Sequence, residues 1–336
     1  MSENHLSELR FDALPLSESV RAGIRDAGFE FCTPIQAKTL PIALEGHDVA
    51  GQAQTGTGKT AAFLIAAYER LLKSQGQQGE PRQPRLFALA PTRELAVQIA
   101  NDAEVLGKHT GLKIGLAFGG TDYEKQRTTL QNGVDLLIGT PGRIIDYYKQ
   151  GVFKLDQVEV AILDEADRMF DLGFIKDIRY LLRKLPAPDK RLNMLFSATL
   201  SQRVMELAYE HMNEPDLIRI EPDKVTADRV RQAVFFPSNE DKMPLLIGLI
   251  KEMGQARIMI FVNMKREAER VQDYLEANGI HAKAISGDVP QKKRLRMLMQ
   301  FQAGELPVLI GTDVASRGLH VPDVQSVSYT HLRAHE

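Results

Sequence analysis

Short apolar runs recur along the first two thirds of the chain, each followed by a small or polar cluster. They are HDVAGQ (47–52), LFALAPT (86–92), VDLLIGT (134–140), VEVAILDE (158–165) and LNMLFSAT (192–199). Continuous apolar runs of this length are typical of strands buried on both faces, and so of a parallel sheet. The intervening stretches, such as ELAVQIANDAEVLGKH (94–109), have the period of amphipathic helices. This alternation predicts a doubly wound α/β domain over residues 1–218 with right-handed crossovers.

A polar segment without an apolar run, 219–230, interrupts the pattern and is interpreted as a linker. The alternation then resumes. Strands are predicted at RIMIFVN (257–263), HAKAIS (281–286) and LPVLIGT (306–312), with helices at REAERVQDYLEANG (266–279) and QKKRLRMLMQFQAG (291–304). The sequence therefore predicts a second α/β domain over residues 231–326.

Composition narrows the class of protein only slightly. The 336 residues are 43% hydrophobic and 26% charged, as in ordinary globular proteins. No run of about 18 apolar residues exists, so no membrane partner is expected. Cys32 is the only cysteine, which excludes an intrachain disulfide and fits a reducing, cytoplasmic location. The formal net charge of −2 does not indicate nucleic-acid binding, so any such site must be a local patch or be formed by backbone amides on loops.

The stretch AQTGTGKT follows the first predicted strand and opens a predicted helix. This is the context of a phosphate loop, although Ala53 stands where the strict pattern has Gly. The backbone of Gln54, Thr55, Gly56, Thr57 and Gly58 is expected to face phosphate oxygens at the helix N-terminus. Lys59 would pair with the β- and γ-phosphates and Thr60 would hold Mg²⁺. The alternative is a glycine-rich turn before an ordinary helix.

A second candidate site lies where the buried strand of AILDEAD ends in acids. We assign Asp164 to the metal ion and Glu165 to the attacking water, because carboxylates at a strand end serve these roles in phosphoryl transfer. The alternative is a solvated acidic turn.

Residues 164–167 spell DEAD, and with the phosphate loop they make the chain resemble the DEAD-box ATP-dependent RNA helicases. The resemblance covers nearly all of residues 10–326. It implies two RecA-like domains in tandem, ATP and Mg²⁺ as cofactors, and RNA bound independently of its sequence. Several stretches of the sequence are also similar to the bacterial helicase subtype that belongs to the RNA degradosome. One such feature is His320, which stands where most of the family has Asp. That similarity implies a role in mRNA degradation and an RNase E scaffold as a further partner.

The resemblance also assigns residues. In the segment GFEFCTPIQ (28–36), Phe29 would pack and Gln36 would hydrogen-bond the adenine, with Phe11 upstream. Ser197 and Thr199 would couple hydrolysis to strand separation, and Asp313 would meet the ribose. The implied RNA contacts of the first domain are Pro91, Thr92, Arg93, Gly119, Gly120, Thr140, Gly142 and Arg143. Those of the second domain are Asn263, Thr312 and Arg317, the last two lining a cleft shared by the domains.

The last residues depart from the family pattern. We find no HRxGRxGR segment, whose arginines would complete the ATP site, and 327–336 resembles a translated sequencing adapter. We therefore expect a non-native tail over 327–336 and an incomplete second domain over 231–326, marginally stable because a sheet edge stays unpaired. The alternative is a natural truncation with an unusual tail.

Other functions remain possible at this point. A chain without these arginines would also suit a non-catalytic clamp that binds RNA in an ATP-dependent manner. A DNA helicase or a transport ATPase could share the fold, but the adenine-reading segment and SAT (197–199) argue against both.

Overall fold

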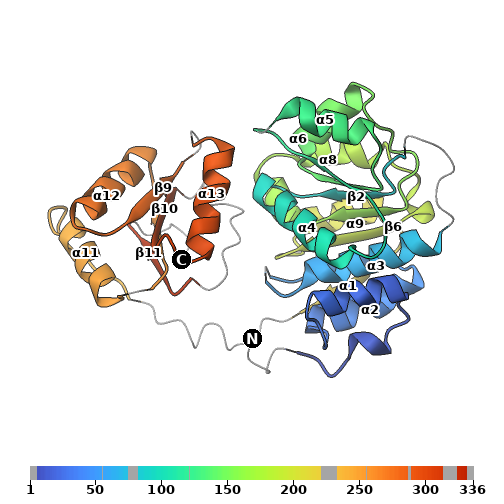
Figure 1. The fold of residues 1–336 in the computed structure, drawn as a ribbon, viewed down its shortest axis with the longest axis horizontal. Coiled ribbons are helices and arrows are strands. Elements are labelled where there is room, and N and C mark those ends of the chain that lie inside the picture. The colour runs from blue at the N-terminus through green and yellow to red at the C-terminus, as the bar shows by residue number, and fades with distance from the viewer. Residues whose placement is uncertain are drawn as a thin grey trace. The chain divides into compact units, whose positions relative to one another are not determined.

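The computed structural model describes residues 6–54, 56–74, 82–120, 122–220, 233–254, 256–286, 289–312 and 324–330. The chain divides into two compact units, Met1–Val225 and Thr226–Glu336, each built on one parallel sheet (Figure 1). The division falls inside the segment 219–230 that was predicted to be a linker, most of which lies outside the described residues.

The sheet of the first unit has seven parallel strands in the order β3-β4-β2-β5-β6-β1-β7. Their bounds are β1 Val49–Gln52, β2 Leu86–Leu89, β3 Ile114–Ala117, β4 Leu136–Gly139, β5 Val160–Leu163, β6 Leu192–Ser197 and β7 Asp216–Arg219. All five predicted strands are confirmed. The sequence did not predict β3 and β7, which form the two edges of the sheet. Edge strands are only partly buried, and so they lack the continuous apolar run of central strands.

Helices cover both faces of this sheet. One layer contains α1 (Glu18–Asp26), α2 (Pro34–Glu45), α3 (Lys59–Lys73) and α4 (Arg93–Leu106). The other contains α5 (Tyr123–Gln131), α6 (Pro141–Lys149), α7 (Ala166–Asp171), α8 (Ile175–Leu182) and α9 (Gln202–His211). Figure 1 shows α1 to α3 on one side of the sheet and α5, α6 and α8 on the other. The predicted doubly wound α/β fold is confirmed.

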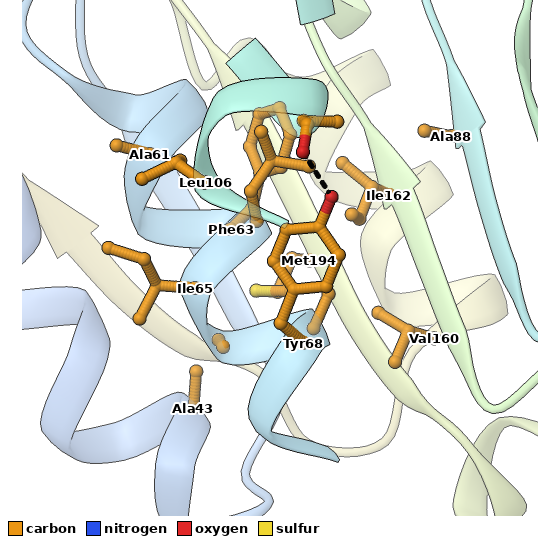
Figure 2. Packing of buried hydrophobic residues seen from close by; sticks show 14 of the residues in the cluster. Ala43, Ala61, Phe63, Ile65, Tyr68, Ala88, Leu106, Val160, Ile162 and Met194 are labelled. Atoms are coloured by element: carbon orange, nitrogen blue, oxygen red, sulfur yellow. Dashed lines mark hydrogen bonds between the residues drawn. The ribbon is translucent and has the colours of Figure 1, made fainter. Parts of the chain in front are cut away.

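The strands bury both faces because neighbouring residues point into opposite layers. In β2, Leu86 and Ala88 belong to the core beneath α1–α4, whereas Phe87 and Leu89 belong to the core beneath α5–α9. Figure 2 shows the first of these cores, where the fully buried Tyr68 of α3 lies between the helices and the sheet. Its hydroxyl donates a hydrogen bond to the carbonyl oxygen of Ala103 at 2.6 Å and thereby joins α3 to α4.

A buried polar network closes the amino end of the sheet. Asp48, just before β1, accepts hydrogen bonds of 2.7 Å from the backbone and side-chain amides of Asn193 and from the backbone of Asn213. Arg191 donates to the carbonyl oxygen of His211 at 3.0 Å, and burial lowers the pKa of Arg191 to about 10. These groups form hydrogen bonds with one another at the amino end of the sheet. The candidate site residues lie at the opposite, carboxyl end.

The second unit has a smaller parallel sheet in the order β11-β8-β10-β9. Its strands are β8 (Ile258–Val262), β9 (Ala282–Ile285), β10 (Val308–Thr312) and β11 (Ser326–Tyr329). Its helices are α11 (Lys242–Glu252), α12 (Lys265–Ala277) and α13 (Gln291–Gln302). The three predicted strands are confirmed. The strand β11 includes residues assigned to a non-native tail, and Tyr329 stacks on Phe261 with ring centroids 5.0 Å apart. The origin of residues 327–336 stays a prediction.

Among the helices of the described ranges, none has both the length and the apolar character needed to cross a membrane.

Candidate functional site

The strand order of the first unit divides the carboxyl edge of its sheet into two halves. The neighbouring strands β5, β6 and β1 lead into the DEAD residues, the SAT residues and the phosphate loop. The neighbouring strands β3, β4 and β2 lead into Gly119, Thr140 and Pro91. Ligands of open parallel sheets bind at carboxyl ends. Residues that are far apart in sequence therefore form one nucleotide half and one adjoining half.

The phosphate loop connects β1 to the N-terminus of α3. It begins at Ala53, whose backbone N–H donates to the carbonyl oxygen of Ser197 at 3.0 Å. Gly56 and Gly58 have φ angles of 82° and 88°, which side chains other than glycine rarely adopt. Thr57 Oγ1 donates to the carbonyl oxygen of Gln54 at 2.8 Å, closing the turn. The predicted Thr55 lies outside the described residues.

We expect Gly58→Ala to weaken nucleotide binding by at least tenfold. A methyl group there would lie 2.5 Å from Gln36 Nε2, in addition to a left-handed backbone strain of about 1–2 kcal/mol. Gly111→Ala is the matched control, because Gly111 has a φ of 71° and nothing within 4 Å of the added carbon. Fluorescent-nucleotide titration measures both variants. Equal affinity in wild type and Gly58→Ala would contradict this account of the loop.

Lys59 and Asp164 form a buried ion pair at the centre of the nucleotide half. Lys59 Nζ lies 3.1 Å from Asp164 Oδ1, and the two side chains are 5% and 0% exposed. The same oxygen accepts a hydrogen bond from the backbone of Glu165 at 2.9 Å. The other oxygen, Asp164 Oδ2, is buried without a hydrogen-bond partner in the described part of the chain. An unsatisfied carboxylate oxygen at a phosphate loop fits a ligand that supplies positive charge or a bound water.

The donor set fits Mg²⁺ in particular. No group of three or more His, Cys, Asp or Glu side chains that could hold a metal occurs among the described residues. Mg²⁺ is usually bound by one or two carboxylates together with substrate phosphates and water. Asp164 Oδ2, with Thr60 in the first turn of α3, meets that requirement.

Glu165 has an unusual backbone conformation for a residue with a side chain. Its φ of 53° lies in the left-handed region, and it caps the N-terminus of α7. Such strain is characteristic of functional positions. Arg168 Nη1 lies 3.2 Å from Glu165 Oε2. Burial raises the pKa of Glu165 and the charge of Asp164 raises it further, whereas Arg168 and Lys59 oppose the rise.

Asp167 joins the acidic segment to the SAT residues, a role that the sequence analysis did not assign. Its Oδ2 accepts hydrogen bonds from Thr199 N at 3.1 Å and Thr199 Oγ1 at 3.3 Å. Its own backbone N–H donates to Ser197 Oγ at 3.2 Å. Ser197 is fully buried and Thr199 is exposed. A displacement of either segment therefore has to move or break three hydrogen bonds. The only sequence feature that could have pointed to Asp167 is its position as the last residue of the DEAD segment.

The segment predicted to read adenine lies against the phosphate loop. Gln36 Oε1 accepts from the backbone of Thr33 at 2.8 Å, and Gln36 Nε2 donates to the carbonyl oxygen of Gly58 at 3.0 Å. The buried Gln36 is thus tied to the loop that would surround the phosphates. Phe11 and Phe29 stack with ring centroids 6.2 Å apart and line one pocket of about 220 Å³. The structure therefore ties Gln36 to the phosphate loop and places Phe11 beside Phe29, within the predicted segment.

On the adjoining half of the edge, two arginine side chains lie close to Gly119. A carbon added to Gly119 would lie 3.4 Å from Arg93 Nη2 and 3.8 Å from Arg143 Nη2. The N-terminus of α4 is capped by Thr92, whose Oγ1 accepts from Leu95 N at 3.3 Å. Thr140 precedes the first turn of α6, which contains Gly142 and Arg143. Two guanidinium groups and two helix N-termini therefore converge, an arrangement suited to phosphate oxygens.

Arg143 is fixed by two tyrosines that the sequence analysis did not single out. Its guanidinium carbon lies 4.7 Å from the ring centroid of Tyr123 and 5.3 Å from that of Tyr147. Arg143 Nη1 donates to Tyr147 Oη at 3.3 Å, and that hydroxyl donates to the carbonyl oxygen of Tyr123 at 2.8 Å. Neither tyrosine lies within a motif used for the prediction, so contacts across α5 and α6 were needed to find them.

In the second unit, two predicted residues meet at one edge. Asn263 directly follows β8, and Thr312 ends β10, where it pairs with Val262. Both therefore lie at the carboxyl ends of neighbouring strands. The predicted Asp313 and Arg317, and the atypical His320, lie outside the described residues.

Comparisons with known proteins identify the family of the chain. Residues 33–207 match the family model of the DEAD/DEAH box helicase, and residues 241–333 match the helicase conserved C-terminal domain. The ATP-dependent RNA helicase RhlB of Pasteurella multocida is 58% identical over 327 residues, covering 97% of this chain and 77% of that protein. RhlB of Haemophilus influenzae is 57% identical, covering 97% of this chain and 79% of that protein.

Two solved structures resemble this chain over most of its length. S. cerevisiae Dbp5 bound to RNA and ADP BeF3 is 29% identical with a TM-score of 0.83, covering 96% of this chain and 81% of that one. A DEAD box protein from Methanococcus jannaschii is 33% identical with a TM-score of 0.58, covering 97% of this chain and 86% of that one.

The chain belongs to the DEAD/DEAH box helicase family. Within that family it is of the RhlB type, at 55–58% identity to proteins of that name. The predicted family, subtype and pair of RecA-like domains are confirmed.

Proposed function

We propose that the chain is an ATP-dependent RNA helicase whose first unit places ATP and RNA on adjoining halves of one sheet edge. The observation that carries this proposal is the strand order. It brings Lys59, Asp164 and Glu165 together beyond the carboxyl ends of β1 and β5, beside the Arg93–Arg143 pair beyond the ends of β2 and β4. Separation of short duplexes by local bending of one strand fits this layout.

On the nucleotide half, the phosphates would lie on the N-terminus of α3 with Lys59 beside the β- and γ-phosphates. Mg²⁺, held by Thr60 and Asp164, would neutralise developing phosphate charge. Glu165 would orient the water that attacks the γ-phosphate, with Arg168 holding its carboxylate at 3.2 Å. Gln36, Phe11 and Phe29 would contain the adenine. The proposed roles of Ala53, Gln54 and Thr55 follow from the phosphate-loop pattern, and that of Asp313 follows from the resemblance alone.

On the adjoining half, RNA phosphates would contact Arg93, Arg143 and the small residues around them. These small residues are Pro91, Thr92, Gly119, Gly120, Thr140 and Gly142. Asn263, Thr312 and Arg317 of the second unit are proposed as further RNA contacts on the basis of the resemblance. Contacts of this kind recognise the sugar-phosphate backbone of RNA and do not distinguish its bases. RNA as the nucleic acid is supported by the names of the RhlB relatives and by the RNA-bound Dbp5 structure.

Coupling between the halves would pass through Asp167. Loss of the γ-phosphate would shift Glu165, and Asp167 would transmit the shift to Ser197 and Thr199 through its three hydrogen bonds. We expect Asp167→Ala to retain ATP binding but to lose most duplex separation. Strand displacement per ATP hydrolysed measures the effect, and a ratio equal to that of wild type would contradict this route.

We expect Arg143→Gln to lower the affinity for single-stranded RNA and its dependence on salt. Each phosphate contact on a single strand contributes about 0.7 to the slope of log K against log salt. The variant should therefore reduce that slope by about 0.7. The control is Arg127→Gln, at a half-buried arginine of α5 whose guanidinium lies 3.7 Å from the Glu124 carboxylate. Fluorescence anisotropy at several salt concentrations measures the slope, and an unchanged slope would remove Arg143 from the interface.

Strand displacement on matched RNA and DNA duplexes tests the proposal as a whole. We expect ATP-dependent release of a short RNA strand and weaker or no release from DNA. ATP-dependent RNA binding without turnover would instead indicate a clamp, which the presence of Lys59, Asp164 and Glu165 does not favour. A part in mRNA degradation, an RNase E scaffold as partner and a cytoplasmic location are proposed by analogy with the RhlB type.

A further inference from the structure

A group of basic side chains surrounds Tyr180 on the outer helices of the first unit, separate from every residue assigned above. We call it the Tyr180 patch, formed around that ring by Lys149, Lys176, Arg179, Arg183 and Lys184. Tyr180 and the residues of and just after α8 line a groove of about 470 Å³. Figure 1 shows α6, which ends at Lys149, and α8 on the same side of the sheet.

The patch has a surplus of positive charge. Arg179 Nε and Arg183 Nη2 lie 2.8 Å and 3.5 Å from the carboxylate of Glu210 and are partly neutralised. The three lysines, all exposed, have no carboxylate partner in the described part of the chain. Three unpaired ammonium groups stand out on a chain whose formal net charge is −2. The surplus predicts an anionic ligand.

The aromatic ring narrows the class of that ligand. Lys184 Nζ lies 5.3 Å and Lys149 Nζ 5.8 Å from the Tyr180 ring centroid. Tyr148 packs edge-on against the same ring at 6.4 Å and holds it in place. A fixed, half-buried tyrosine between lysines is the combination that binds single-stranded nucleic acid, through base stacking and phosphate contacts. An acidic peptide would use the charges but would gain little from the ring.

The helix α6 connects the Tyr180 patch to the main cluster of arginines. Arg143 lies in its first turn and Lys149 in its last. The step of six positions from Arg143 to Lys149 corresponds to about 9 Å along the helix axis. At about 100° per residue, Lys149 also lies about 120° around the axis from Arg143, so one RNA strand that contacts both places has to bend around α6.

We propose that the Tyr180 patch is a second RNA-binding site, contacted by the single strand that continues beyond Arg143. The proposal rests on the proposed RNA-helicase function. The patch adds phosphate contacts and one stacked base to RNA that is long enough to reach it. Affinity therefore rises with RNA length, and the chain stays on the unpaired flank of a duplex between rounds of strand separation.

The test compares fluorescein-labelled oligouridylates of about 6 and about 20 nucleotides, bound to the full chain and followed by anisotropy over a range of salt. The patch variant is Lys149→Gln/Lys176→Gln/Lys184→Gln. Its control is Lys38→Gln/Lys73→Gln/Lys108→Gln, three exposed lysines of the α1–α4 layer, on the opposite face of the sheet. We expect the patch variant to bind the long RNA at least tenfold more weakly, with a salt slope reduced by about 2. Its affinity for the short RNA, and that of the control for both, should equal wild type.

Tyr180 supplies a second, independent readout. Tyr180→Phe should retain the affinity for the long RNA, whereas Tyr180→Ala should lower it about tenfold through lost stacking. If the lysine variant binds the long RNA with wild-type affinity and slope, the proposal is overturned, and an acidic protein becomes the better candidate for the patch. Failure of the wild-type chain to bind even the short RNA would instead overturn the proposed function.

Discussion

Replacing Glu165 with Gln is expected to lower RNA-stimulated ATP hydrolysis by about 10²- to 10⁴-fold, the usual contribution of a group that positions or deprotonates a nucleophile. The amide keeps the size of the carboxylate but cannot accept the proton of the water. Its neighbours Asp164 and Lys59 remain, so ATP affinity should change little. Steady-state phosphate release at saturating RNA measures the rate, and nucleotide titration measures the affinity.

Arg168 provides the matched comparison for this variant. Arg168 Nη1 donates a hydrogen bond to Glu165 Oε2 at 3.2 Å. Arg168→Lys should therefore keep the positive charge but lose the planar guanidinium that directs this hydrogen bond. We expect a smaller fall in rate, with unchanged ATP affinity. Glu165→Gln with a rate within threefold of wild type would show that another group orients the water, and the proposed role of Glu165 would then be wrong.

Replacing Lys59 with Met is expected to destabilise the first unit even without nucleotide. The Lys59–Asp164 pair is almost completely buried, and removal of one partner leaves the other charge without compensation. Breaking such a pair costs about 3–5 kcal/mol, which corresponds to a fall in melting temperature of roughly 6–20 °C for a domain of this size. Scanning calorimetry of the apo chain measures the shift.

The double variant Lys59→Met/Asp164→Asn separates pairing from packing. We expect it to recover at least half of the lost melting temperature, because no unpaired charge remains, while ATP binding stays lost. If Lys59→Met melts at the wild-type temperature, then the two charges do not stabilise each other in the absence of nucleotide. In that case, ATP binding would not require Lys59 to exchange a stabilising contact with Asp164 for contacts with the ATP phosphates.

The strands that bury both faces could be predicted from sequence, because β1, β2, β4, β5 and β6 are continuous apolar runs. The edge strands could not. β3 alternates between buried and half-buried residues, and only Ile218 of β7 is buried. The sequence also placed the candidate site residues at the ends of the central strands, and the parallel strand order brings these ends to one edge of the sheet.

Contacts between the motifs could not be predicted from their spacing. Gln36 and Gly58 belong to different segments, and their hydrogen bond depends on how α2 packs against α3. The link from Asp167 to Thr199 requires β5 and β6 to be neighbours, which only the sheet order shows. Tyr147 lies one turn after Arg143 on α6, a spacing that the sequence analysis did not use, whereas Tyr123 contacts Arg143 from α5.

The most direct test of the central claim is the rate of ATP hydrolysis by the 336-residue chain as single-stranded RNA is added. If ATP and RNA occupy adjoining halves of one edge and are coupled through Asp167, the rate rises with RNA concentration and then saturates. Arg143→Gln should shift that curve to higher RNA without changing the basal rate. A rate that is the same at every RNA concentration would contradict the coupling of the two halves.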